Sequence, residues 1–158
     1  LTKNVIEDET RKNNAITTFN TLLEWGIIPI VNENDAISTE EIEFGDNDTL
    51  SAYVSKLVNA DLLVILSDID GFYDGNPSLE TSKLIPVIEE ITDEIRECAG
   101  GEGTRRGTGG MRTKLNAADI VCPSGIDMII TNGENPENLY KIVNGEQVGT
   151  LFKAKVKD

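Results

Sequence analysis

Leu62-Leu63-Val64-Ile65-Leu66 is an unbroken apolar run, and Ser67-Asp68-Ile69-Asp70-Gly71 follows it directly. A short run of branched apolar side chains that ends in turn residues is typical of a strand buried on both faces. Strands of this kind belong mostly to parallel sheets, because helices cover such sheets on both sides. The stretch therefore predicts a core strand of an α/β protein, with a polar turn at its carboxyl end.

The residues before this strand predict a strand–helix–strand unit. Residues 27–31 form a second short β-branched run, and a helix with four apolar residues on one face separates it from residues 62–66. A helical connection between two strands is typical of parallel pairing. We also expect an earlier amphipathic helix over residues 8–24, which Gly26 ends. The four apolar residues of the connecting helix are Leu50, Val54, Leu57 and Val58.

The second half of the chain predicts three more strands and three more helices. The expected strands are 84–88, an edge strand because Pro86 lacks an N–H for a ladder, then 128–131 and 150–152. The expected helices are 92–99, one with Met111, Leu115 and Ala118 as its buried stripe, and one from Asn135 to about Gly145. Residues 1–158 are thus expected to form one domain of the α/β class, a three-layer sandwich with a mostly parallel central sheet.

Composition excludes several classes of function. A net charge of −14 argues against a nucleic acid partner, and apolar runs of five or six residues are far below the ~20 needed to span a membrane. With no recognisable leader, we expect a cytoplasmic protein. The chain has no histidine, which excludes a Ser-His-Asp triad, a Cys-His nucleophile and a histidine zinc site. We expect Cys98 and Cys122 to be reduced core thiols.

The stretch Gly107-Thr108-Gly109-Gly110-Met111-Arg112-Thr113-Lys114 runs from a glycine-rich loop into a helix. Cations near a helix N-terminus are unfavourable by ~0.3–1 kcal/mol each, and an anion bound to the free N–H groups reverses that penalty. Arg105 and Arg106 add two more cations nearby. The stretch matches neither a Walker loop nor a dinucleotide fingerprint. It predicts the phosphate half of a nucleotide site, with an ordinary solvated helix start as the alternative.

Acidic residues collect where the predicted strands end. Residues 32–35 lead into Glu40, Glu41, Glu43, Asp46 and Asp48, with no Lys or Arg from 32 to 48. Together with residues 67–70 and 131–132, they follow strands whose carboxyl ends should meet at one sheet edge, where ligands of such folds bind. The alternative for Asp46 or Asp48 is a helix cap. Calcium-loop spacing fails at both Asp46 and Asp68, so no residue is assigned as a metal ligand.

In these segments the chain resembles the amino acid kinase family. The resemblance rests on residues 29–36 with 45–48, on 66–73 and on 107–114, and it extends over essentially all of the chain. The acidic loop resembles the branch that phosphorylates glutamate. Family members begin with a lysine-bearing strand and glycine- and serine-rich loops that match nothing here, so the resemblance implies a domain incomplete at its N-terminus and inactive alone. It also implies that a C-terminal RNA-binding-like domain, common in relatives, is absent.

The resemblance implies a role for each site residue. Asp35 and Asn47 would hold the amino acid substrate, Asp48 would organise the catalytic lysines, and Lys114 would neutralise the transferring phosphoryl group. The implied nucleotide-binding residues are Ser67, Asp68, Thr108, Gly109, Gly110, Met111, Arg112, Thr113 and Lys114.

The implied reaction is ATP-dependent, Mg²⁺-assisted phosphorylation of the γ-carboxylate of L-glutamate to γ-glutamyl phosphate, the first step of proline biosynthesis. A carboxylate with a reference pKa of about 4.3 is deprotonated at neutral pH and needs no general base. The resemblance further implies a homo-oligomer and proline as an inhibitor. The alternatives are a relative acting on acetylglutamate, aspartate or UMP, a non-catalytic nucleotide- or amino-acid-binding fragment, and a folding or assembly unit.

Overall fold

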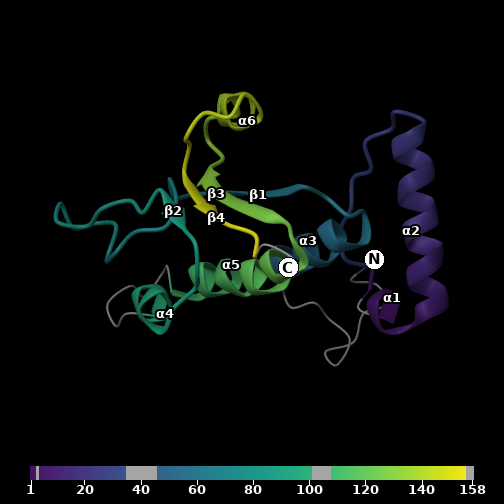
Figure 1. Cartoon of the computed structure of the whole chain (residues 1–158), viewed down its shortest axis with the longest axis horizontal. Coiled ribbons are helices and arrows are strands. Elements are labelled where there is room, and N and C mark those ends of the chain that lie inside the picture. The colour runs from purple at the N-terminus through teal and green to yellow at the C-terminus, as the bar shows by residue number, and fades with distance from the viewer. Residues whose placement is uncertain (3, 35–45, 101–107, 156–158) are drawn as a thin grey trace.

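The computed structural model describes residues 1–2, 4–34, 46–100 and 108–155. Their strands form one four-stranded sheet with the order β1-β3-β4-β2 (Figure 1). Pairing of β1 with β3 and of β2 with β4 is parallel, whereas β3 and β4 are antiparallel. The expected mostly parallel sheet is confirmed. The strands are β1 (Leu62–Ser67), β2 (Val87–Ile88), β3 (Asp127–Asn132) and β4 (Thr150–Phe152).

Helices lie on both sides of this sheet in Figure 1, with α3, α4 and α5 on one side and α6 on the other. The helix start at residue 8 is explained by Asp8, whose carboxylate accepts a hydrogen bond from the Arg11 N–H at 2.8 Å and caps α2. No described helix has the length and apolar character needed to cross a membrane. The helices are α1 (Asn4–Glu7), α2 (Glu9–Glu24), α3 (Asn47–Leu57), α4 (Asp93–Gly100), α5 (Thr108–Val121) and α6 (Glu137–Val143), with a 3₁₀ turn at Cys122–Ser124.

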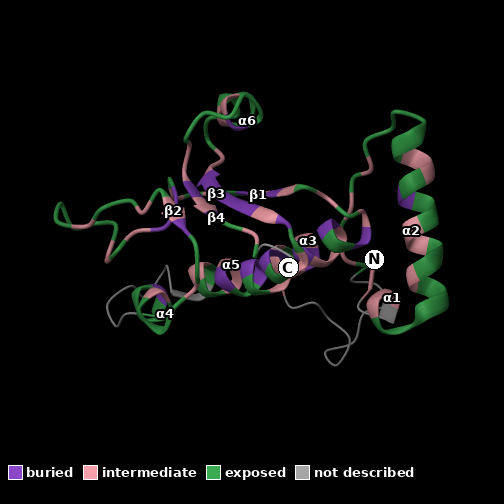
Figure 2. Ribbon diagram, in the orientation of Figure 1, coloured by how far each residue is buried: buried purple, intermediate pink, exposed green. Residues whose placement is uncertain are grey.

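The core lies between the sheet and the helices α3 and α5 (Figure 2). Leu115 and Ala118 of α5 are buried there, as the sequence pattern predicts, and so are Met128 and Ile130 of β3. Phe72 and Phe152 close the cluster near the sheet centre, with ring centroids 6.2 Å apart in an edge-to-face arrangement. This packing fixes α5 against β3, which positions the first turn of α5 relative to the sheet.

The strand expected at residues 27–31 is wrong. In the described part of the chain these residues pair with no strand, and Ile28 and Ile30 are 85% and 99% exposed. A strand exists only through hydrogen bonds to a neighbouring strand, so an apolar β-branched run without such a neighbour forms no strand. The predicted unit of residues 27–31, α3 and β1 is therefore not formed, and β1 pairs with β3 instead. The strand expected at residues 84–88 does lie at the edge of the sheet. It is shorter than expected, because β2 has only two residues.

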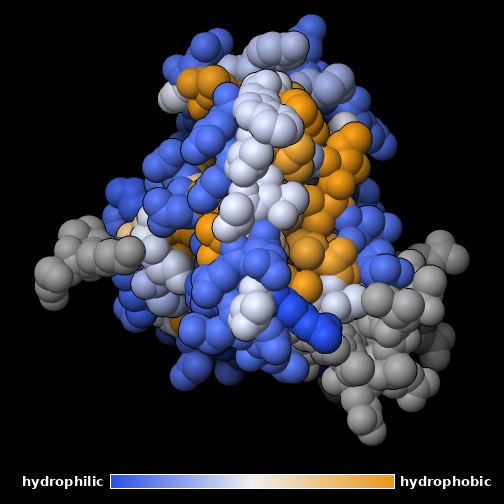
Figure 3. Space-filling model, turned by 90° about the vertical axis from the view of Figure 1, so that its right-hand side faces the viewer, coloured by the Kyte–Doolittle hydropathy of each residue, from blue (hydrophilic) through white to orange (hydrophobic). Residues whose placement is uncertain are grey.

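An apolar band crosses the face of the molecule on which α1 and α2 lie (Figure 3). Exposed large apolar side chains lie at the end of α2 and just after it. These are Leu23, Trp25, Ile27, Ile28 and Ile30.

The two cysteines differ. Cys122 is a buried free thiol, as expected, but Cys98 is exposed, so its assignment to the core is wrong. The exposed Cys98 thiol lies 3.5 Å from the Asp74 carbonyl, whereas Ala99 is the buried residue of α4. Desolvation raises the pKa of the Cys122 thiol to about 11.

Candidate active site

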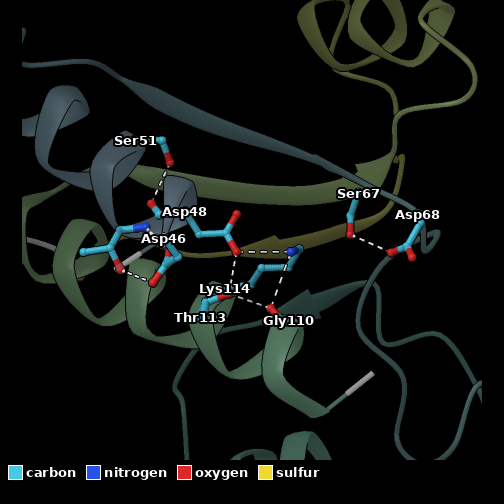
Figure 4. Close-up of polar contacts among 9 residues, drawn as sticks. Asp46, Asp48, Ser51, Ser67, Asp68, Gly110, Thr113 and Lys114 are labelled. Carbon is cyan, nitrogen blue, oxygen red and sulfur yellow. Dashed lines mark hydrogen bonds and ion pairs between the residues drawn. The ribbon is translucent and has the colours of Figure 1, made fainter. Parts of the chain in front are cut away.

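The candidate site lies where the carboxyl ends of β1 and β3 meet the N-terminal turns of α3 and α5 (Figure 4). Strand register sets Ser67, the last residue of β1, beside Asn132, the last residue of β3. The Gly133 N–H donates to the Ser67 carbonyl at 2.8 Å and extends this pairing past the strand. The expectation that residues 67–70 and 131–132 meet at one sheet edge is confirmed, but the expectation that residues 32–35 follow a third strand there is wrong, because residues 27–31 form no strand.

Helix α3 begins at Asp46, which leaves Asp48 available to the site. The Asp46 carboxylate accepts hydrogen bonds from the Thr49 N–H at 2.7 Å and from the Thr49 hydroxyl at 3.0 Å. Of the two candidate caps, Asp46 is therefore the cap. The Asp48 side chain lies in the first turn of α3, where the helix dipole favours a carboxylate.

Asp48 and Lys114 form an ion pair between α3 and α5. Lys114 Nζ lies 3.1 Å from Asp48 Oδ2, and the two side chains are only 12% and 19% exposed. The same Oδ2 atom accepts a hydrogen bond from the Thr113 hydroxyl at 2.6 Å. Figure 4 shows the Lys114 side chain between Asp48 and the Gly110 carbonyl, which Nζ approaches to 3.4 Å. One carboxylate oxygen thus holds two consecutive side chains of α5.

The start of α5 is suited to an anion. The first N–H groups of a helix have no partner within it, and in α5 these include Gly109 and Gly110. Among the described residues, a Cβ on Gly110 would meet no atom within 4 Å, so none of them fills the space beside this turn. The Met111 side chain packs against the core, and only its backbone can face a ligand. Arg112 is exposed.

A second polar group sits at the ends of β1 and β3. The Ser67 hydroxyl donates to Asp68 Oδ1 at 3.2 Å, and Asn132 Nδ2 donates to Asp70 Oδ1 at 2.9 Å. Asn132 in turn accepts from the Glu134 N–H at 2.9 Å. The link between Asp70 and Asn132 had no assigned role from sequence. The sequence feature that could have predicted this link is the presence of polar residues at the ends of two adjacent strands.

The turn after β1 needs glycine at position 71. The Phe72 N–H donates to Thr150 Oγ1 at 2.7 Å, and Thr150 Oγ1 donates to the Ile85 carbonyl at 2.6 Å. A Cβ on Gly71 would lie 2.7 Å from the same Oγ1 atom. Thr150 is fully buried, so it cannot move aside, and the close approach holds residues 67–70 at the sheet edge.

The expected substrate residues are only partly placed. Asn47 is exposed in the first turn of α3, one residue from Asp48. Asp35 lies outside the described residues, as do Glu40, Glu41 and Glu43. Arg105 and Arg106 also lie outside them. Among the described residues no group of three or more carboxylates, cysteines or histidines could hold a metal ion.

The sequence and the fold both match known proteins. The model of the family described as amino acid kinase family matches residues 1–132. A protein of Clostridium perfringens named glutamate 5-kinase is 64% identical over 160 residues, which cover 98% of this chain and 60% of that protein. One of the same name from Lactococcus lactis is 52% identical, covering 98% of this chain and 59% of that protein. The chain therefore spans about 60% of the length of these relatives.

A solved structure of UMP kinase from Bacillus anthracis has the same fold. It superposes with a TM-score of 0.60 at 19% sequence identity, over 92% of this chain and 52% of that one. At such low identity the likeness concerns the fold alone. It confirms the expected architecture, and the family match confirms the resemblance read from the motifs.

Proposed function

The chain belongs to the amino acid kinase family, and we propose that it is a large part of an enzyme that phosphorylates the γ-carboxylate of L-glutamate with ATP. The main observation behind this proposal is the Asp48–Lys114 ion pair. It holds a largely buried ammonium group close to the N-terminal turn of α5, where free N–H groups can bind an anion. Relatives named glutamate 5-kinase, 52% and 64% identical, support the choice of reaction.

In this proposal, α5 binds the phosphates of ATP. The N–H groups of Thr108, Gly109, Gly110 and Met111 face the phosphate oxygens, and Arg112 adds charge from the surface. Lys114 moves its hydrogen bonds from Asp48 to the transferring phosphoryl group as negative charge spreads over its oxygens. Asp48 keeps the ammonium group aligned before and after that step. Ser67 and Asp68 line the rest of the nucleotide site at the end of β1.

The acceptor needs binding and alignment more than proton transfer. Its γ-carboxylate is already ionised at neutral pH, so the protein has to bring two anions together. We assign Asp35 to the ammonium group of glutamate and Asn47 to its polar groups, because both belong to the acidic segment that ends at α3. The product is γ-glutamyl phosphate.

Mg²⁺ fits this residue set as an ion carried by the nucleotide. Magnesium is usually held by phosphates, water and only one or two carboxylates, so it needs no dedicated cluster of protein ligands. Asp68 is an exposed carboxylate beside the Ser67 hydroxyl and is our candidate ligand. When bound, the ion would neutralise charge on the phosphates.

The wider role follows the same proposal. The reaction would be the first step of proline biosynthesis in the cytoplasm, carried out by a homo-oligomer and inhibited by proline. The main alternative is another acceptor, such as UMP, aspartate or acetylglutamate. Asp35 argues against UMP, which has no ammonium group. The remaining alternative is a module that binds nucleotide or glutamate without turnover.

An acceptor panel tests the proposal. The full-length protein that contains this chain is supplied with Mg-ATP, and ADP release is measured with L-glutamate, aspartate, acetylglutamate or UMP. We expect release with L-glutamate alone. Release with a different acceptor would retain the kinase and reject glutamate, and binding of ADP without any release would favour the binding module.

A further inference from the structure

We infer that Thr113 is a positioning residue that acts through Asp48, rather than a ligand of the nucleotide phosphates. The inference rests on the proposed function for its catalytic consequence and on the geometry of α3 and α5 for the link itself. The inference changes the role of Thr113, which the sequence resemblance assigns to the nucleotide-binding residues.

The Thr113 backbone is not available to a phosphate. Thr113 is the sixth residue of α5, so its N–H belongs to the intrahelical ladder and not to the free first turn. Any contact with the nucleotide would have to come from its hydroxyl.

That hydroxyl is turned toward α3. Its oxygen lies 2.6 Å from Asp48 Oδ2 and 2.8 Å from the Gly110 carbonyl, both of them hydrogen-bond acceptors. A threonine hydroxyl has one hydrogen to donate, and the shorter contact is to the charged acceptor, which makes the stronger bond. The Thr113 side chain is half-buried, with little freedom to turn away.

In this arrangement one oxygen of Asp48, Oδ2, accepts hydrogen bonds from both Thr113 and Lys114. If Lys114 turns to the phosphoryl group during transfer, Asp48 loses its cation while remaining four-fifths buried. The hydrogen bond from Thr113 then keeps the Asp48 carboxylate in place and offsets part of the cost of burying its charge. Lys114 can return to the same position after each turnover. Thr113 thus affects the alignment of Lys114 without touching the substrate.

The link is tested by a double-mutant cycle on the unfolding of this chain. Thr113→Val and Asp48→Ala are made singly and together, and the folding equilibrium constants are measured in urea. We expect Thr113→Val to lower the constant about 10-fold in the wild-type background and less than about 3-fold in the Asp48→Ala background. In the Asp48→Ala background the single hydroxyl hydrogen can donate to the Gly110 carbonyl instead, and loss of that bond accounts for the smaller decrease expected there. Equal losses in the two backgrounds would overturn the inference.

The catalytic consequence is tested in the full-length protein. Thr113→Val is expected to lower kcat roughly 10- to 100-fold through misalignment of Lys114, with the Kd for ADP changed less than about 3-fold. Thr113→Ser keeps the hydroxyl and should restore kcat. Thr17→Val is the matched control, because Thr17 bonds a carbonyl of its own helix at 2.9 Å and contacts no carboxylate of the site.

The two failures are distinguishable. A large loss of ADP affinity with kcat preserved would make Thr113 a phosphate ligand and overturn the inference. If the wild-type protein releases no ADP with any acceptor, the proposed function fails, and the unfolding cycle alone decides whether Thr113 positions Asp48.

Discussion

Lys114 Nζ and Asp48 Oδ2 lie 3.1 Å apart although the two residues are 66 positions apart in sequence. The pair joins the N-terminal turns of two helices and is mostly shielded from water. A shielded charge pair is effective in catalysis, because electrostatic interactions strengthen where water is excluded. Removing only one of the two side chains also lowers the stability of the fold, because the remaining charge is then buried without a partner.

Replacing Lys114 with alanine is therefore expected to reduce turnover by at least about 10²–10³-fold in the full-length protein, through loss of charge stabilisation. The measurement is glutamate-dependent ADP release. Lys56→Ala is the control, since Lys56 is an exposed lysine in the last turn of α3 and should have near-normal rates. A turnover within threefold of wild type for Lys114→Ala would contradict the catalytic role.

Gly71→Ala is expected to destabilise the fold by ~1–3 kcal/mol, because the new methyl group would collide with the buried Thr150 hydroxyl. Urea unfolding measures the effect. Gly100→Ala is the matched control, since no described atom lies within 4 Å of its added Cβ and it ends α4 without a left-handed backbone. Equal stability of the two variants would show that residues 71 and 150 separate freely.

Thr150→Val should cost about 1–3 kcal/mol, because it leaves the buried Phe72 N–H without its acceptor. The shape of the side chain is nearly unchanged, so the loss reports the hydrogen bonds and not a cavity. Amide hydrogen exchange at Phe72 should accelerate along with the drop in unfolding free energy. Unchanged protection of that amide would contradict the assignment.

The Cys122 thiol gives the stability a defined pH dependence. Its pKa rises from 9.0 to about 11 on folding, because burial disfavours the thiolate. The folded state thus holds the proton more tightly, so stability is fully present below pH 9 and falls as the pH rises from about 9 to 11. Cys122→Ala should flatten this fall relative to wild type, as measured by urea unfolding across that range. A slope that stays unchanged would refute the assignment.

The apolar band beside α2 should make the isolated chain self-associate, because exposed apolar patches favour contact with another surface. Ile28→Asp combined with Ile30→Asp is expected to lower the sedimentation-derived mass toward that of one chain. Val143→Asp is the control, as Val143 is equally exposed at 85% but lies on α6. The explanation fails if both variants associate alike.

Periodicity alone predicts most of the regular elements. Helices α2, α3, α4 and α5 and strands β1, β3 and β4 lie within a few residues of the expected ranges. These elements bury their own apolar stripes, so their sequences carry the signal. Residues 27–31 carry an equally strong β signal, but a strand requires a partner that the segment does not specify. Pairing also depends on the neighbour, and the pattern of residues 27–31 does not say which segment that neighbour is.

The site divides in the same way. The free first turn of α5 and the polar ends of β1 and β3 follow from local sequence, whereas the Asp48–Lys114 pair depends on how α3 packs on α5. Met111 fits both the buried stripe and the nucleotide loop, and the structure assigns its side chain to the former. The role of Asp35 stays a prediction, since it lies outside the described residues.

Helix α5 carries Lys114 in its first half, and Leu115, Ala117, Ala118 and Val121 of the same helix are among the most deeply buried residues. A helix anchored in this way does not fray from the core without unfolding the whole domain. The ammonium group is therefore placed by a helix whose following residues are among the most deeply buried that the structure describes. Amide exchange along residues 115–121 and loss of ADP binding should consequently follow one and the same opening event, and stabilising mutations far from the site should slow both together.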